Sequence, residues 1–489
     1  MIKIAVFWVG IVGMTAKDTF ENAQKLLKKH NQSHLLTFWE QVDEAQRENL
    51  VRQIQKLDFE KIDEWVENLV KKAPSGQKRG VLTPAVSYRR DPADPEQKKA
   101  IDFGKELIRK GKVAAFVVAG GQGTRLGFDG PKGNFPISPV KDKTFFQIFA
   151  EYIAAVSERY QTTCPWYIMT SPLNHCETQE IFRLNDYYGL KEQDVFIFEQ
   201  GTLPNFSFDG KILLADKANI ACSPDGHGGS IKALQRSGAL DDMKRRGVKY
   251  ISYWQVDNPL VSIFDPLFIG LHALNEAEMS SKAVIKTDPM EKVGNFCLEG
   301  GMLTVIEYTE FNELPDSAGE LQAKKRNPDG SLVFKLGSIA IHIISVDFVD
   351  KLNTEGFSLP LHRAKKKIPH IDGHGNHLVP DEENGIKLES FIFDALPKTS
   401  KSIILETPRS EEFAPTKNAT GIDSVETTRQ MMVERAANWI ESAHLTVPKK
   451  EVSDCIIEIA PSFALEKEDI KAKLNQIPEI KPGDELYLS

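Results

Sequence analysis

The feature that most constrains the fold is an apolar run followed at once by a glycine-rich stretch, over residues 113–133. Val113–Ala119 is short enough for a buried strand of a parallel sheet. Six glycines follow, at 120, 121, 123, 127, 130 and 133, with Arg125, Lys132 and one acid, Asp129. Such glycines let backbone N–H groups approach a ligand, and the two cations favour an anionic one. An ordinary turn needs only about one or two glycines, so we predict a polyphosphate-binding loop.

Two common phosphate-binding loops do not fit this stretch. A Walker-type P-loop requires Gly-Lys-Ser/Thr, but Lys132 lies between Pro131 and Gly133. The dinucleotide fingerprint Gly-x-Gly-x-x-Gly fails because one residue too many separates Gly123 from Gly127. Neither a P-loop ATPase nor a nicotinamide enzyme is therefore predicted.

Composition narrows the class of partner. The chain has 61 Lys and Arg against 69 Asp and Glu, a net charge of −8, which argues against nucleic acid or an anionic membrane as the main partner. The five cysteines include no Cys-x-x-Cys pair, so we expect free thiols in a reducing cytoplasm and no zinc site. The length suits roughly three domains, or one large α/β domain with appendages.

Short β-rich runs alternate with helical stretches after residue 100. Strands are predicted at Val113–Ala119, Trp166–Thr170, Val195–Glu199, Tyr250–Val256 and Lys282–Lys286, and helices at Phe145–Tyr160 and Gly229–Arg246. This alternation predicts an α/β fold with a mostly parallel sheet covered on both faces. Ligands of such sheets bind beyond the carboxyl ends of the strands, where the glycine loop emerges.

Asp257 directly follows one of these predicted strands, which places its carboxylate at the same edge as the glycine loop. A hard oxygen ligand at that position is what Mg²⁺ bridging phosphates requires. The alternative is that Asp257 only caps a turn at Asn258-Pro259. Beside the glycine loop, we favour the metal ligand.

The flanking regions predict smaller parts. Residues 1–13 are an apolar extension, too short to span a bilayer. We interpret it as a disordered or docked extension, or as a mis-assigned start with Met14 as the true one, rather than as a targeting segment. Residues 14–99 predict a helical region and a linker, with Asp58 capping a helix that carries an apolar stripe. Residues 100–420 are predicted to form the catalytic domain and 421–489 a small α+β domain.

The glycine loop resembles the signature Gly-Gly-x-Gly-Thr-Arg-Leu-Gly, followed by Pro-Lys, of nucleotidyltransferases that make nucleotide sugars. It is most similar to the eukaryotic-type UDP-N-acetylglucosamine pyrophosphorylases. Further motifs are collinear with that family over about residues 100–420: Phe198-Glu-Gln-Gly-Thr-Leu-Pro204, Pro224-Asp-Gly-His-Gly-Gly229, Gln255-Val-Asp-Asn258, Val305-Ile-Glu-Tyr308, Asn384-Gly-Ile-Lys387 and Glu412-Phe-Ala-Pro-Thr-Lys-Asn418. The resemblance implies a Rossmann-like nucleotidyltransferase sheet in a cytoplasmic enzyme that is a monomer or a weak homo-oligomer.

The resemblance also implies a reaction, in which UTP and a sugar 1-phosphate give a UDP-sugar and pyrophosphate. The anionic phosphate oxygen of the sugar attacks the α-phosphorus in line, so no general base is needed. The protein has to position two anions and offset their charge, which fits a site of cations and glycines. The implied cofactor is Mg²⁺, with Mn²⁺ as an alternative.

Site residues are carried over position by position. Those implied to act on the phosphates during catalysis are Arg125, Lys132 and Lys417. Those implied to bind the nucleotide are Ala119, Gly120, Gly121, Gly123, Thr124, Gln200, Gly226, Asp257 and Lys387, with Asp257 also the metal ligand. Those implied to bind the sugar are His227, Gly294, Glu307, Tyr308 and Ser338.

Two of these positions depart from the family pattern. The N-acetylglucosamine enzymes usually have asparagine where this chain has His227 and Ser338. Replacing an amide by an imidazole or a hydroxyl changes which sugar groups can be hydrogen-bonded, and a buried group left without a partner discriminates strongly between substrates. These two positions therefore leave the identity of the sugar open. N-acetylglucosamine 1-phosphate is the first expectation, with glucose 1-phosphate or a broad range of sugars as alternatives.

Two other classes of protein compete with this interpretation. A nucleotide-sugar glycosyltransferase would normally carry an Asp-x-Asp motif after a strand, and no such motif is found. A non-catalytic protein on the same fold would be expected to have lost Arg125, Lys132 or Asp257, yet all three are present.

Overall fold

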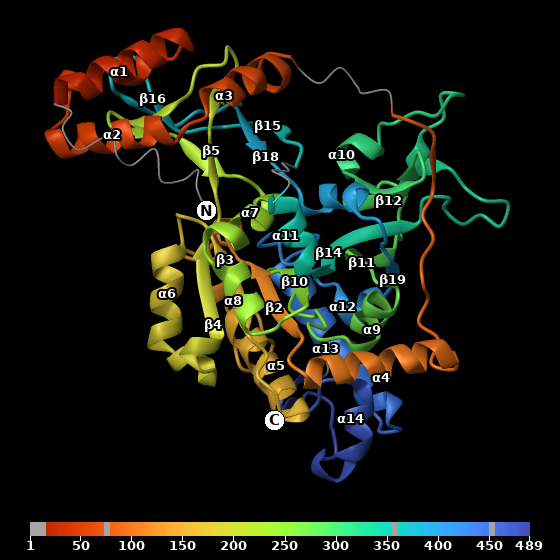
Figure 1. Ribbon diagram of the computed structural model, residues 1–489. Helices are drawn as coiled ribbons and strands as arrows, with labels where there is room; N and C mark the ends of the chain where they lie inside the picture. The colour runs from red at the N-terminus through yellow and green to blue at the C-terminus, as the bar shows by residue number, and fades with distance from the viewer. Residues whose placement is uncertain (1–15, 73–78, 355–358, 449–454) are drawn as a thin grey trace. The chain divides into compact units, whose positions relative to one another are not determined.

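The structure, a computed structural model, describes residues 16–72, 79–354, 359–448 and 455–489 (Figure 1). The predicted extension at residues 1–13 lies outside the described residues. The chain divides into two compact units. The first takes residues 1–78, 202–227 and 360–391, and the second takes 79–201, 228–359 and 392–489. Because one compact unit can contain several domains, the predicted boundaries after residues 99 and 420 stay predictions.

The first unit joins N-terminal helices to short strands from two later segments. Its helices are α1 (Ala16–Lys29), η1 (Ser33–Leu36), η2 (Trp39–Gln41), α2 (Glu44–Lys56), α3 (Phe59–Trp65) and the π-turn η3 (Val66–Val70). Its strands are β5 (Thr202–Pro204), β6 (Phe206–Ser207), β7 (Leu214–Asp216), β8 (Asn219–Ile220), β9 (Cys222–Pro224), β15 (His362–Lys366), β16 (His370–Ile371), β17 (His377–Leu378) and β18 (Gly385–Glu389). Asp58 accepts a hydrogen bond from the Lys61 amide at 3.2 Å, which confirms it as the cap of α3.

A single apolar core holds the three segments of the first unit together. Leu50 and Ile62 from the helices pack with Phe206 from β6 and Ile386 from β18, and each is almost fully buried. Strands β15, β18 and β6 form an antiparallel sheet in that order. The N-terminal helices therefore bury their apolar faces against strands that lie more than a hundred residues away in the sequence.

The second unit is built on one large sheet. The strand order is β1 (Leu82–Pro84), β12 (Gly294–Glu299), β14 (Leu336–Ser345), β10 (Tyr250–Gln255), β2 (Val113–Val118), β3 (Trp166–Thr170) and β4 (Val195–Glu199). Strands β11 (Met279–Ile285), β13 (Met302–Ile306) and β19 (Ile404–Glu406) join its β14 and β12 side. The α/β fold class is confirmed: β10, β2, β3 and β4 are mutually parallel, while β14 runs antiparallel to β10, β11 and β12.

Most helices of the second unit flank the sheet, and the last of them packs in the C-terminal part. They are α4 (Pro95–Arg109), α5 (Phe145–Tyr160), α6 (His175–Leu184), α7 (Ser230–Arg236), α8 (Ala239–Arg245), α9 (Pro266–Leu274), α10 (Tyr308–Phe311), α11 (Val346–Thr354), α12 (Arg409–Glu412), α13 (Val425–Ser442) and α14 (Lys467–Ala472). Short helical turns are η4 (Thr124–Leu126), η5 (Lys132–Asn134), η6 (Asp186–Gly189), η7 (Glu192–Asp194), η9 (Gln322–Lys324), η10 (Ile392–Lys398) and η11 (Leu474–Gln476), and η8 (His227–Gly229) begins at the last residue of a first-unit segment. The core packs α5 onto the sheet, with the rings of Phe149 and Trp254 5.3 Å apart.

Most predicted bounds of strands and helices agree with the structure within a residue, with two exceptions, one of which is that the strand predicted at Lys282–Lys286 is β11, Met279–Ile285. The single helix predicted over Gly229–Arg246 is wrong, because Gly238 adopts a φ of 81° and separates α7 from α8. Glycine populates that region without the steric cost that other residues incur, and here it ends one helix and starts the next.

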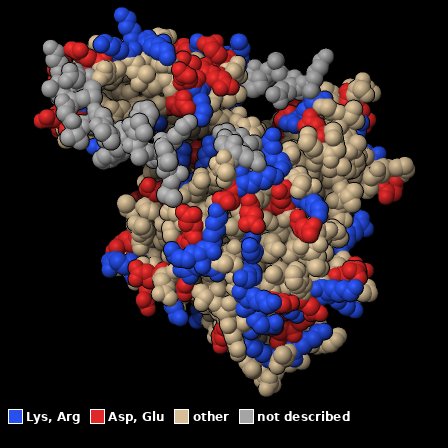
Figure 2. Space-filling view, in the orientation of Figure 1, with Lys and Arg blue, Asp and Glu red and all other residues tan. Residues whose placement is uncertain are grey.

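The C-terminal residues form a small α+β part within the second unit. The strands β20 (Ile456–Ile459) and β21 (Glu485–Leu488) pair in parallel, and Ile440 of α13, Ile457 and Ile470 of α14 share a core. On the face shown in Figure 2, acidic and basic side chains are interspersed. No helix among the described residues is long and apolar enough to cross a membrane.

Candidate active site

The glycine loop lies at the carboxyl edge of the parallel strands and closes on itself. The Lys132 amide donates to the Gly121 carbonyl at 3.0 Å, and the Gly123 amide donates to the Gly130 carbonyl at 2.9 Å. The Asn174 side chain, just beyond β3, donates to the carbonyls of Ala119 and Gly121 at 3.0 and 3.2 Å. Hydrogen bonds to these carbonyls fix the shape of the loop.

Several carbonyl groups of the loop accept hydrogen bonds, whereas several of its amide N–H groups donate none to the described residues. Among the described residues, none accepts a hydrogen bond from the amides of Gly120, Gly121 or Gln122. Backbone N–H groups left in this way suit an anion. A Cβ on Gly120 would lie 2.5 Å from Gln200 Oε1, so any other residue would displace the amide of Gln200. The predicted nucleotide residues Gly120 and Gln200 are therefore neighbours.

Three cations and a carboxylate gather around this loop. Lys132 is 7% exposed, and its Nζ lies 3.8 Å from Asp257 Oδ2 and donates to the Thr416 carbonyl at 3.3 Å. Burial lowers the pKa of Lys132; Asp257 opposes this, and the positive charges of Arg125 and Lys417 add to it. The structure thus brings together the three cations implied to act on the phosphates, together with Asp257, from segments as far apart in the sequence as Arg125 and Lys417.

Lys417 and Asp257 are positioned by backbone hydrogen bonds. The Thr416 amide donates to the Asp257 carbonyl at 2.9 Å, and the Ala419 amide donates to the Arg125 carbonyl at 3.1 Å. The Lys417 amide donates to the Asp423 carbonyl at 2.7 Å. The segment that carries Lys417 is therefore attached both to the end of β10 and to the glycine loop.

Asp423 is a residue that the sequence reasoning missed. Burial raises the pKa of its carboxyl, Lys417 opposes that rise, and Asp257 adds to it, so Asp423 shares the electrostatic environment of the site. It lies five residues beyond the last motif, which ends at Asn418, and no spacing singled it out. Its connection to the site becomes visible only once the chain has folded.

The donors present fit a magnesium ion that is shared with the substrate. Among the described residues, no group of three or more His, Cys, Asp or Glu side chains could hold a metal by itself. Mg²⁺ in nucleotide enzymes is commonly held by one or two carboxylates together with substrate phosphates and water. Asp257, with Asp423 close to it, matches that kind of donor set.

Four of the predicted sugar residues also lie together, on the antiparallel side of the sheet. Gly294 of β12 pairs with Ser338 of β14. A Cβ on Gly294 would lie 3.7 Å from Ser338 Cβ and 3.9 Å from Glu307 Oε1. Glu307 directly precedes α10, which begins with Tyr308.

The remaining predicted residues, Gly226, His227 and Lys387, belong to the first unit and are described within it alone. The His227 ring stacks on Phe391 with centroids 5.3 Å apart. Burial, aided by nearby His362, lowers the pKa of His227 to about 4, so the imidazole is neutral at pH 7. Lys387 lies on β18, and burial together with Lys366 lowers its pKa against the opposing effect of Glu389.

A parallel α/β sheet that gathers a glycine loop, three cations and a carboxylate at its carboxyl edge has the architecture of a nucleotidyltransferase. The chain belongs to the UTP–glucose-1-phosphate uridylyltransferase family, whose model matches residues 86–489. It is an enzyme of the uridylyltransferase class, and the resemblance stated from the sequence is confirmed.

Individual relatives extend the match over most of the chain. The UDP-N-acetylglucosamine pyrophosphorylase of Saccharomyces cerevisiae is 35% identical over 86% of this chain and 91% of its own length. The UDP-N-acetylglucosamine diphosphorylase 2 of Arabidopsis thaliana is 36% identical over 85% and 84%. The structure of the uridine diphosphate N-acetylglucosamine pyrophosphorylase of Trypanosoma brucei, in complex with an inhibitor, superimposes with a TM-score of 0.79, 26% identity and coverage of 97% and 98%.

Proposed function

We propose that this protein transfers the uridylyl group of UTP to N-acetylglucosamine 1-phosphate and releases pyrophosphate. The observation that carries the reaction is the convergence of Arg125, Lys132, Lys417 and Asp257 on the glycine loop. The choice of sugar rests on the names of the yeast and Arabidopsis relatives. Glucose 1-phosphate, which the family description names, is the second candidate.

The site supports an in-line displacement without a general base. The open amides of Gly120 and Gly121 are suited to hold phosphate oxygens, and Arg125 to hold the two phosphates that leave as pyrophosphate. Lys132 and Lys417 offset the negative charge that develops around the α-phosphorus. When bound, Mg²⁺ would supply further charge neutralisation, with Asp257 and Asp423 as its protein ligands.

The sugar end would use the pocket residues on the antiparallel strands. The Glu307 carboxylate can accept charge-assisted hydrogen bonds from sugar hydroxyls. Where the N-acetylglucosamine enzymes usually have the amide of an asparagine, Ser338 offers a hydroxyl, which can form hydrogen bonds with different groups of the sugar. The cytoplasmic location and the monomeric or weakly associated state stay predictions.

The test is pyrophosphate release by the purified protein with UTP, Mg²⁺ and a panel of sugar 1-phosphates. N-acetylglucosamine 1-phosphate should give the highest kcat/KM. A Lys132→Met preparation, purified in the same way, controls for contaminating activity. Faster turnover of glucose 1-phosphate would overturn the proposed sugar, and no release with any sugar would overturn the proposed reaction.

A further inference from the structure

A cluster of charged side chains includes Glu412, the residue immediately before the segment 413–419 that carries Lys417. Lys282, on β11, is fully buried, and its Nζ lies 2.8 Å from Asp265 Oδ2 and also pairs with Glu412. Arg90 pairs with the same two carboxylates, at 3.0 Å from Glu412 Oε1. Burial acts to raise the pKa of Asp265, but Arg90 and Lys282 hold it below its ordinary value. The buried charge cluster consists of the buried Asp265, Lys282 and Glu412 with the partly exposed Arg90, and its two positive and two negative charges balance.

Stability alone is a weak reason for such an arrangement. Removing charges from water is costly, and well-packed apolar residues often stabilise a fold equally well. A buried ion pair does, however, restrict its partners to one geometry, because a misplaced charge would be left without compensation. The cluster is thus suited to fixing the position of whatever is attached to it.

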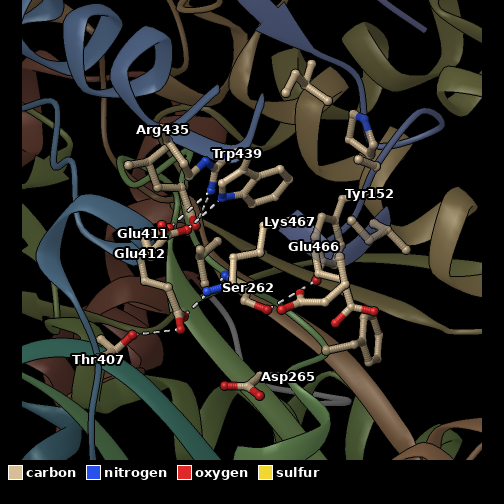
Figure 3. Close-up of a pocket in the computed structure, with 18 of the residues that line it drawn as sticks. Tyr152, Ser262, Asp265, Thr407, Glu411, Glu412, Arg435, Trp439, Glu466 and Lys467 are labelled. Atoms are coloured by element: carbon tan, nitrogen blue, oxygen red, sulfur yellow. Dashed lines mark hydrogen bonds between the residues drawn. The ribbon is translucent and has the colours of Figure 1, made fainter. Parts of the chain in front are cut away.

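Glu412 is the member attached to the active-site segment. It is the last residue of the short helix α12, and its side chain also accepts a hydrogen bond from Thr407 Oγ1 at 2.8 Å (Figure 3). Its carbonyl accepts a hydrogen bond from Asn258 Nδ2 at 2.7 Å, and Asn258 Oδ1 accepts one from the Ala414 amide at 3.1 Å. Asn258 is 4% exposed and directly follows Asp257.

The attachment continues to the reacting groups. Two residues beyond Ala414, the Thr416 amide donates to the Asp257 carbonyl, and the Thr416 carbonyl accepts from Lys132 Nζ. Residues 413–418 form neither helix nor strand, so no regular backbone ladder fixes them. Hydrogen bonds to Asn258 and Asp257 hold one side of this segment, and Glu412 holds its start. Thr428, Asp423 and Arg125 make further hydrogen bonds with residues 414–419, so the connection through Asn258 is one of several.

The cluster itself lies apart from the glycine loop. Arg90, Asp265 and Glu412 line a cavity of 690 Å³, shown in Figure 3, and none of its lining residues belongs to the loop at 120–133. Glu412 therefore lies outside the phosphate-binding loop, and the route by which it is connected to the reaction is the set of residues that it positions.

We propose that the buried charge cluster is a positioning device, in which Glu412, through Asn258, sets the location of Lys417 relative to Asp257 and Lys132. The inference rests on the proposed function for its kinetic part. Its structural part concerns the order of residues 413–419 and can be measured without substrate.

The test compares Glu412→Gln and Glu412→Asp with a control elsewhere in the same unit. Asp242 is a suitable control because it is 5% exposed, pairs with Arg246 at 2.9 Å and accepts from the Tyr167 hydroxyl at 2.6 Å. The Asp242→Asn variant disrupts a buried charge without touching the segment. Glu412→Asp keeps the charge but shortens its reach, which separates placement from charge balance.

Both Glu412 variants should lower kcat at least ~10-fold with the KM for UTP changed less than ~3-fold, because small misplacements of catalytic groups are costly. Hydrogen exchange of the amides in 413–419 should be at least ~10-fold faster in the absence of substrate. Asp242→Asn should lose stability while keeping kcat and the exchange of this segment unchanged.

Unchanged kcat and exchange in folded Glu412 variants would overturn the proposal. If the wild type releases no pyrophosphate, the proposed function fails, but the exchange measurement still decides the positioning role. Should the Glu412 variants not fold, Asn258→Ser breaks the same connection while leaving the four charges of the cluster in place. It should produce the same losses, and its failure to do so would equally overturn the proposal.

Discussion

Lys132→Met tests the electrostatic role of the glycine loop, because methionine keeps the buried apolar stem and removes only the ammonium. That group lies 3.8 Å from Asp257 Oδ2, at the centre of the site. Two unit charges about 4 Å apart interact by about 4 kcal/mol at an effective dielectric constant of about 20. Only part of a charge is redistributed in the transition state, so the loss should be about 2–3 kcal/mol, roughly a 100-fold decrease in kcat.

The same variant should not lose stability. The lowered pKa of Lys132 indicates that its burial disfavours the charged form, and methionine has no such cost. Steady-state kinetics with UTP and thermal unfolding of both proteins provide the comparison, and the melting temperature should be unchanged or higher. A kcat within about 3-fold of wild type in a folded Lys132→Met protein would refute the assigned role, since a buried charge at this distance cannot be neutral in effect.

Three other changes have defined outcomes. Burial lowers the pKa of His272 to about 3, so between pH 6.5 and 3 the unfolded chain binds the extra proton; the fall in unfolding free energy between pH 7 and 5, measured by urea titrations, should be about 2 kcal/mol smaller in His272→Gln than in the wild type. Gly133→Ala would place a Cβ 2.1 Å from Phe146 Cζ and should cost about 1–3 kcal/mol in chemical denaturation; a neutral effect would mean that the ring moves freely. Asp257→Asn should raise the Mg²⁺ concentration for half-maximal activity at least ~10-fold, whereas an unchanged magnesium titration would remove Asp257 from the metal site.

The sequence predicted those parts of the fold that local patterns determine. Strands Trp166–Thr170 and Val195–Glu199 and the helix Phe145–Tyr160 have the predicted bounds, because apolar runs and caps lie within a few residues of each end. The strand predicted to begin at Lys282 begins instead at Met279. A lysine inside a buried strand looks like a boundary in sequence, since its compensating carboxylates lie on other segments.

The residues of the candidate site also fall into those that local sequence patterns predict and those that they do not. Arg125, Lys132 and Asp257 could be predicted because they lie in or just after motifs with a recognisable spacing, and their proximity followed from the parallel sheet. Asp423 and Glu412 could not be predicted, because their importance comes from contacts between distant segments. The antiparallel strand β14 was missed for a related reason: its pairing with β10 depends on register across more than eighty residues.

The division of the first unit among three stretches of sequence has a consequence for its synthesis. The apolar faces of α1 to α3 are complete once Val70 is made, but their partners Phe206 and Ile386 emerge much later. At ~5–20 residues per second, the roughly 320 residues between Val70 and Phe391 take about 15–65 s to translate. Until then the apolar faces of these helices lack their partners, so we expect the folding yield of the N-terminal segment to depend on the speed of translation and on chaperones that cover exposed hydrophobic surface.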